Sequence, residues 1–211
     1  MPHQNRVSPF GELFATPERG TPMGNRGGRL HDDKRWLTRR RWTSKQWICC
    51  RLEFNNRHRK VWGKGYTELF FLDEVTAFAA GHRPCFECRR KDAERFARLF
   101  SGRKKRASAV EMDRVLHAER LIAKGKRAHP RKLDTLPDGA MIALGVEAFA
   151  VRSRRLLRWT PEGYRGSISR PRGAEADVLT PPSILAVLRA DMCRSGIQVQ
   201  RVNVNTLFQI K

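Results

Sequence analysis

Acidic residues and long apolar runs are scarce in this sequence. It has 21 Asp and Glu residues against 43 Lys and Arg residues in a chain of 211, and therefore a net charge of +22 at pH 7. No apolar stretch is long enough to span a bilayer, and no hydrophobic signal segment stands near residue 1. We therefore expect a cytoplasmic protein that has no membrane partner.

The excess of basic residues is larger than solubility requires. Arginine, which outnumbers lysine here, makes bidentate contacts with phosphate groups. Basic surfaces also gain affinity for nucleic acid by releasing condensed counterions, whatever the base sequence. Nucleic acid is therefore the expected partner, and a DNA-binding protein would be associated with the nucleoid. A basic surface that is merely solvated is the alternative.

Cysteine is also sparse, with an adjacent pair at Cys49 and Cys50, a Cys-x-x-Cys at Cys85 and Cys88, and an isolated Cys193. This pattern is not a disulfide framework, and in a reducing compartment it indicates metal ligation. Two thiolates separated by two residues can bind one tetrahedral zinc ion. A thioredoxin-like redox pair is disfavoured, because the predicted helix precedes these cysteines instead of following them.

The stretch from residue 73 to residue 90, DEVTAFAAGHRPCFECRR, organises the rest of the chain. Asp73 can cap a helix, Gly81 can end it in a left-handed conformation, and Pro84 prevents its continuation. Cys85 and Cys88 follow in a tight turn that is surrounded by arginines.

Residues 70–90, FFLDEVTAFAAGHRPCFECRR, resemble the second half of the zinc-binding domain of Ada-type DNA methylphosphotriester repair proteins. In that family a strand and an Ala-rich helix lead into Gly-aromatic-Arg-Pro-Cys-x-x-Cys-Arg, and both cysteines bind zinc. An upstream strand carries Cys-x-x-x-Cys, whose first cysteine also accepts a methyl group from the DNA backbone. Here Cys49 and Cys50 match that strand, and Glu53 and Phe54 stand where its second cysteine would be. The resemblance covers residues 45–90.

The resemblance implies zinc as the cofactor, with Cys85 and Cys88 as ligands. Alternation along residues 47–54 places Cys50 on the buried face of a strand, which makes Cys50 the third expected ligand. The fourth is open among Cys49, His58, His82 and a carboxylate, and the more distant histidines His31, His117 and His129 are also open.

The predicted fold class is α+β, a small zinc-knuckle module followed by helices and a small antiparallel β-sheet domain. Residues 1–29 form an extended arm rich in Pro and Gly, residues 30–126 the Ada-like module with its helices, and residues 132–211 a small basic β-rich domain with one helix. Helices are expected at 73–81, 91–99, 109–123 and 183–190, a linker at 127–131 and an edge strand at 197–210.

The predicted function is a zinc-stabilised nucleic-acid-binding protein, more a binding protein than an enzyme, with DNA favoured over RNA. The expected nucleic-acid contacts are Arg39, Arg40, Arg41, Trp42, Arg57, Arg59, Arg83, Arg89 and Arg90, with the Arg-rich strands of 135–175 as a second surface. One alternative is an Ada-like repair protein in which Cys50 is the methyl-accepting catalytic residue. A metal-dependent nuclease of the His-Asn-His type is another. A structural zinc in a protein that docks on ribosomal RNA or a protein partner is equally compatible with the sequence.

Overall fold

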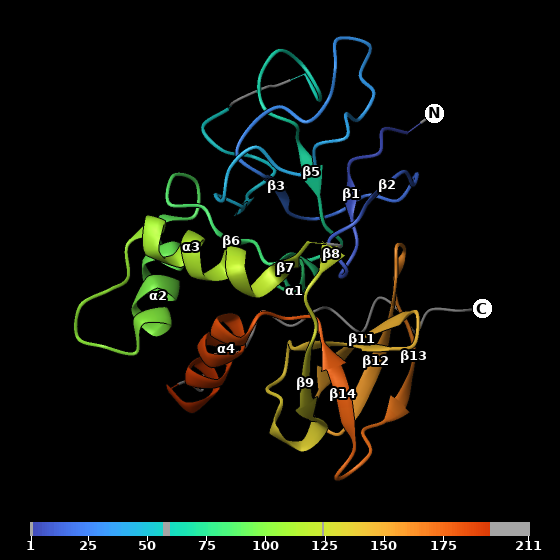
Figure 1. The fold of residues 1–211 in the computed structure, drawn as a ribbon, viewed down its shortest axis with the longest axis vertical. Helices are drawn as coiled ribbons and strands as arrows, with labels where there is room; N and C mark the ends of the chain where they lie inside the picture. The colour runs from blue at the N-terminus through green and yellow to red at the C-terminus, as the bar shows by residue number, and fades with distance from the viewer. Residues whose placement is uncertain (1, 57–59, 124, 195–211) are drawn as a thin grey trace.

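The computed structural model describes residues 2–56, 60–123 and 125–194. Within them the chain is α+β, as predicted from the sequence, with a mixed sheet, a group of helices and an antiparallel sheet. In Figure 1 the mixed sheet occupies the upper part, the helices lie to the left, and the antiparallel sheet lies below. None of the described helices is long and apolar enough to cross a membrane.

The mixed sheet is built from very short strands. Its members are β1 (Arg6–Val7), β2 (Leu13–Phe14), β3 (Met23–Asn25), β4 (Ile48–Cys50), β5 (Leu69–Phe70) and β6 (Arg83–Pro84), in the order β2-β1-β5-β3-β4-β6. The segment 2–29, which was expected to be an extended arm, therefore supplies three of the six strands. Gly24 explains how β3 fits inside the sheet, because a Cβ atom there would stand 2.2 Å from the carbonyl oxygen of Ile48.

Local capping signals set the limits of the helices, as the sequence predicted. Helix α1 (Glu74–Ala79) is capped by Asp73, whose side chain accepts a hydrogen bond from the Thr76 N–H, and Gly81 follows at φ +83°. Helix α2 (Arg90–Ser101) ends at Gly102 in the left-handed conformation. Helix α3 (Ala109–Arg120) begins with a capping box and ends before the predicted residue 123, because β7 (Leu121–Ile122) and β8 (Gly125–Lys126) form a hairpin there.

The antiparallel sheet follows in the order β13-β12-β11-β10-β14-β9. Its strands are β9 (His129–Lys132), β10 (Met141–Leu144), β11 (Glu147–Arg152), β12 (Arg155–Thr160), β13 (Gly163–Ser169) and β14 (Glu175–Val178), with the 3-10 helix η1 (Leu133–Thr135) after β9. The linker predicted at 127–131 was therefore wrong, since β9 pairs with β14. A strand was not expected here because Pro130 lacks a backbone N–H donor. Proline is tolerated at this position because β9 is at the edge of the sheet.

Helix α4 (Pro182–Arg194) returns from this sheet to the helices. Ile184 and Val187 pack in one apolar cluster with Phe78, Phe96 and Met112 of the other three helices. Leu185 of the same helix packs into the core of the antiparallel sheet. The C-terminal helix therefore belongs to the packing of both parts. The edge strand predicted at 197–210 lies outside the described residues.

Helix α1 lies between the two sheets (Figure 1). Ala79 at its end packs with Met141 and Tyr164 of the antiparallel sheet. The Tyr164 hydroxyl donates to the Asp73 carboxylate at 2.8 Å, and the Trp159 indole N–H donates to the Thr76 hydroxyl at 3.0 Å. The mixed sheet and the antiparallel sheet thus both pack against α1.

Candidate metal centre and basic surfaces

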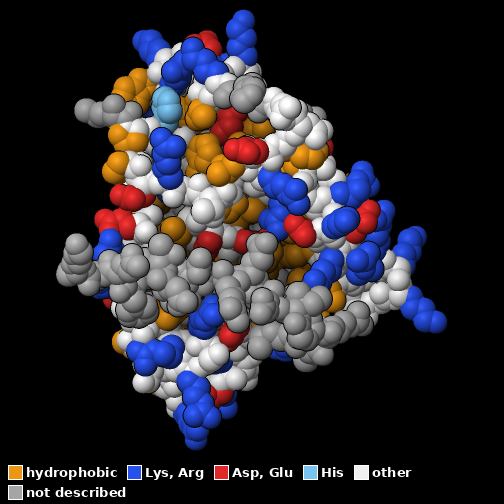
Figure 2. Space-filling view, turned by 180° about the vertical axis from the view of Figure 1, so that it is seen from behind, with side chains coloured by type: hydrophobic (Ala, Val, Ile, Leu, Met, Phe, Trp, Pro, Cys, Tyr) orange, Lys and Arg blue, Asp and Glu red, His pale blue; other side chains and the backbone are white. Residues whose placement is uncertain are grey.

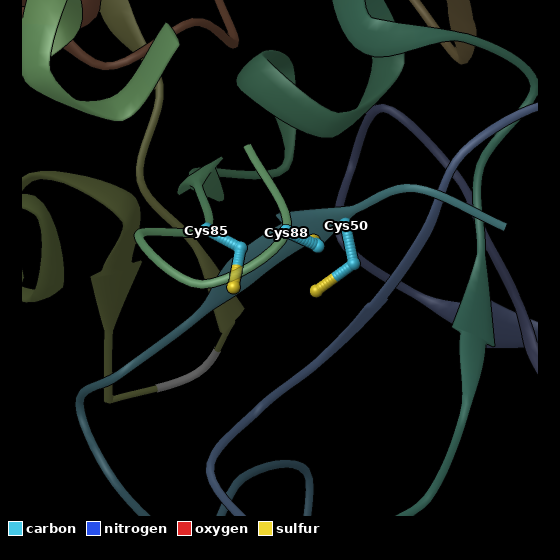
Figure 3. Close-up of side chains that lie close together, drawn as sticks. All are labelled: Cys50, Cys85 and Cys88. Carbon is cyan, nitrogen blue, oxygen red and sulfur yellow. The ribbon is translucent and has the colours of Figure 1, made fainter. Parts of the chain in front are cut away.

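Three cysteines converge at one end of β4 and β6. These strands are parallel neighbours, with Cys49 beside Pro84, so the next residues, Cys50 and Cys85, also lie side by side. Cys88 comes from the loop that leads into α2 (Figure 3). The three sulfur atoms lie within 4.8 Å of one another.

Main-chain donors and mutual hydrogen bonds favour ionised sulfur in this cluster. The Glu87 N–H donates to the sulfur of Cys85, and the Arg51 N–H donates to that of Cys88, both at 3.4 Å. Hydrogen bonding from the Cys50 thiol lowers the pKa of Cys85 to about 5 and also lowers the pKa of Cys88. The same two contacts raise the pKa of Cys50, which keeps its proton longest. Such a cluster can provide thiolate ligands.

The arrangement could hold a metal ion. Thiolates are ligands for zinc, and the close approach of all three sulfurs suits one shared ion. No fourth His, Cys or carboxylate of the described residues joins the three. The cluster opens into a hollow of about 780 Å³, the thiol pocket, whose lining includes Asn25, Leu52, Phe54 and Tyr66.

Cys49 is not part of the thiol cluster, although it was an expected ligand. Successive residues of a strand point to opposite faces, and Cys49 is fully buried in an apolar cluster with Val7, Leu69 and Phe71. Burial raises the pKa of its thiol to about 12, despite a contact of 3.6 Å from the Arg89 guanidinium. Cys49 is therefore a protonated core residue.

The described histidines that were candidate ligands have other partners. His82 is fully buried against Trp47 and Phe71, and burial lowers its pKa well below the usual value. His31 contacts the Thr67 hydroxyl and the Gly63 carbonyl, His129 the Glu119 carbonyl, and His117 the Trp42 ring. The nuclease alternative requires a histidine beside the metal, and no histidine of the described residues lies with the three cysteines. His58 lies outside the described residues, and so do the side chains around Cys193.

Of the arginines expected to contact nucleic acid next to the Cys-x-x-Cys, two are engaged inside the protein. Arg83 is 1% exposed and makes a two-fold ion pair with Asp113, with both distances 2.8 Å. The side chain of Arg89 is 14% exposed and bridges Glu74 and Asp92. Arg90 is on the surface and contacts Glu94 at 3.6 Å. Arg83 is therefore paired inside the protein, with a carboxylate thirty residues away that the sequence does not reveal as its partner.

The remaining predicted residues lie elsewhere. Arg39, Arg40, Arg41 and Trp42 are exposed and line a second hollow, of about 1240 Å³. We call it the basic cleft, since its lining also includes Arg26, Arg120, Lys126 and Arg127, which the sequence did not single out. Figure 2 shows one face of the molecule, on which Lys and Arg side chains are dispersed along the margins among Asp and Glu. Arg57 and Arg59 lie outside the described residues.

The structure therefore defines an α+β protein with a cluster of three thiols that could hold a metal ion. Comparisons with protein-family models, with curated proteins and with solved structures give no match.

Proposed function

We propose that this chain is a zinc-stabilised nucleic-acid-binding protein in which Cys50, Cys85 and Cys88 hold the zinc ion. The convergence of the three sulfurs within 4.8 Å carries the proposal. The strands around them are only two or three residues long, so they contribute few ladder hydrogen bonds. A small sheet of this kind gains stability from a metal ion, because ligands that are dispersed in the unfolded chain become preorganised on folding.

The charge of the chain supports the nucleic-acid part of the proposal. A net charge of +22 favours a polyanion, and phosphate contacts by arginine do not depend on base sequence. DNA is favoured over RNA by the resemblance of residues 45–90 to the zinc-binding domain of Ada-type DNA repair proteins. The thiol pocket is less suited to contact phosphates, since its lining includes three glutamates, Glu53, Glu68 and Glu87, against the single arginine Arg51.

Binding of the zinc-loaded protein to labelled DNA should weaken steeply as salt is raised. With about four phosphate contacts, affinity should fall about 100-fold between 50 and 200 mM salt, because each contact releases condensed counterions. Fluorescence anisotropy with a duplex, a single strand and an RNA of matched sequence measures this. Failure to bind all three at low salt, or binding that is insensitive to salt, would contradict the proposal.

Cys50 favours a second candidate function, that of an Ada-like methyl acceptor, because its side chain lines the thiol pocket. The Cys50 thiolate would attack the methyl carbon of a methylphosphotriester; an S–C bond forms, the C–O bond breaks, and the phosphodiester anion leaves. Bound zinc would keep the thiol ionised at neutral pH. The excess of glutamates over arginine in the pocket lining opposes the approach of neighbouring phosphates, so the binding function is preferred.

Mass spectrometry tests the second candidate. After incubation with methylated DNA, a methyl adduct should appear on Cys50 and be absent from a Cys50→Ser variant that is treated in the same way. Cys49 is the internal control, since its buried, protonated thiol should stay unmodified. An absence of adduct on Cys50 in zinc-loaded protein rejects the methyl-acceptor function.

A further inference from the structure

The basic cleft lies across the mixed sheet from the thiol pocket. Asn25 lines the thiol pocket, whereas the next residue, Arg26, lines the basic cleft. Likewise, Trp47 lines the basic cleft and Ile48 the thiol pocket. This division follows from strand geometry, since adjacent residues point to opposite faces. The basic cleft is therefore a separate site, built from residues next to β3 and β4 and from other segments of the chain.

Two buried arginines form the floor of the basic cleft. Arg26 and Arg120 are 1% and 0% exposed, and the guanidinium carbon of each lies 3.9 Å from the centroid of the Trp47 ring. Their nitrogens donate to main-chain carbonyls, among them those of Gly11 and Gly81 at 2.8 Å. The buried Nε of Arg120 has no hydrogen-bond partner among the described residues.

The charge of this floor is not neutralised within the site. Carbonyl groups satisfy hydrogen bonds but carry no net charge. Asp113 is the carboxylate that raises the pKa of Arg120, and it already makes two hydrogen bonds with Arg83. Burial lowers the pKa of Arg26 and Arg120, and each is lowered further by a neighbouring arginine. Burial, together with Arg120 and Arg26, lowers the pKa of Lys126 to about 7. Unpaired buried cations are costly, and a bound anion would offset that cost.

The rim extends this charge to the surface. Seven Lys or Arg side chains line the basic cleft, against the single carboxylate of Glu12. Arg41 and Arg127 are at the surface there. Trp42 is 39% exposed, with its ring 5.2 Å from that of His117. Arginines interleaved with an accessible aromatic ring are typical of surfaces that bind single-stranded nucleic acid, where bases stack and phosphates pair with cations.

We propose that the basic cleft binds a single-stranded segment of nucleic acid, with its phosphates on the arginines and a base stacked on Trp42. This inference rests on the proposed nucleic-acid-binding function and gives it a location and a form of ligand. A hollow of about 1240 Å³ accommodates a few nucleotides of one strand. Unstacked bases also need an aromatic platform, which a paired duplex does not use.

A pair of charge-matched variants tests the location. Arg41→Ala/Arg127→Ala removes two surface cations from the basic cleft, and Arg98→Ala/Arg114→Ala removes two surface cations of helices α2 and α3, which lie outside the lining of the cleft. The cleft variant should bind a labelled single strand at least about tenfold more weakly, and its salt slope should fall by about two, because each of the two arginines neutralises one phosphate. The control should change affinity less than about twofold. Zinc content and thermal unfolding show that both variants are folded.

A second pair tests the stacked base. Trp42→Ala should weaken single-strand binding about tenfold, in keeping with the removal of one stacking platform, and should affect duplex binding less. Trp36→Ala is the matched control, because Trp36 is 67% exposed and lies outside the lining of the basic cleft. A strand carrying 5-bromouracil should photo-crosslink to Trp42 in the wild-type protein, and peptide mapping should locate the adduct there.

The outcomes separate the inference from the proposed function. A wild-type protein that binds no nucleic acid overturns both. A wild-type protein that binds DNA or RNA while the cleft variant matches the control overturns the inference alone. Inorganic phosphate or a mononucleotide that competes as strongly as the oligonucleotide would make a free phosphate the ligand of the basic cleft, and would also overturn the inference.

Discussion

Replacement of Cys85 by serine is expected to abolish zinc binding and, with it, the fold of the mixed sheet. Structural zinc contributes about 10–16 kcal/mol in small modules, which is as large as the whole stability of a typical domain, about 5–15 kcal/mol. Wild-type protein purified without chelator should contain about one zinc per chain. Elemental analysis and circular dichroism measure both quantities, and Cys50→Ser and Cys88→Ser should behave as Cys85→Ser does.

Cys49→Ala is the control for these variants. It also removes a buried sulfur from β4, but one that points into the apolar core and away from the three ligands. It should therefore retain its zinc and lose about 1–2 kcal/mol of stability through poorer packing. Folded wild-type protein without metal would contradict the zinc centre, and loss of zinc from Cys49→Ala would contradict the ligand assignment.

The second large effect is expected for Asp113→Ala. This change leaves the Arg83 guanidinium buried without its carboxylate, and removal of one partner of a buried ion pair costs about 3–5 kcal/mol. Arg83 lies two residues before Cys85, in the strand that positions the Cys-x-x-Cys, so zinc should also be released more readily. Chemical denaturation measures the first effect, and competition with a chelator measures the second.

Two further variants show whether the buried pair itself is responsible. Glu94→Ala removes a carboxylate from the surface contacts with Arg90 and Arg106, and should cost less than about 1 kcal/mol. Arg83→Met/Asp113→Leu removes both buried charges and should recover most of the stability that Asp113→Ala loses. A cost for Asp113→Ala that is no greater than that for Glu94→Ala would show that the pair is not stabilising.

The helices could be predicted because their signals are local. Asp73, Gly81 and Gly102 each act on the backbone within a few residues, and the structure places helix ends beside all three. The first 29 residues gave no such signal. Strands of two or three residues are too short to show an alternation of apolar and polar positions, and only the neighbours of Gly24 in the folded sheet reveal why glycine is needed there.

Some residues of the candidate sites could also be predicted from the sequence, and others could not. The alternation predicted over residues 47–54 separated Cys50 from Cys49, but it assigned the wrong face to the core. Trp47 and Cys49 are buried, whereas Cys50 lines the thiol pocket, where the register of β4 against β6 sets it beside Cys85. Arg26 and Arg120 could not be recognised, since their common contact with Trp47 joins three distant segments. A count of basic residues does not distinguish Arg83, which is neutralised internally, from Arg41, which faces solvent.

The position of α1 between the two sheets affects the order in which the parts of the protein can fold during synthesis. The cysteines of the centre have all been synthesised by residue 88, yet Tyr164 and Trp159, which bond to Asp73 and Thr76, are added more than seventy residues later. Until then the helix that leads into the Cys-x-x-Cys lacks its contacts with the antiparallel sheet. A nascent chain that stops near residue 130 would therefore carry all three thiols but not the contacts that fix α1 against the antiparallel sheet.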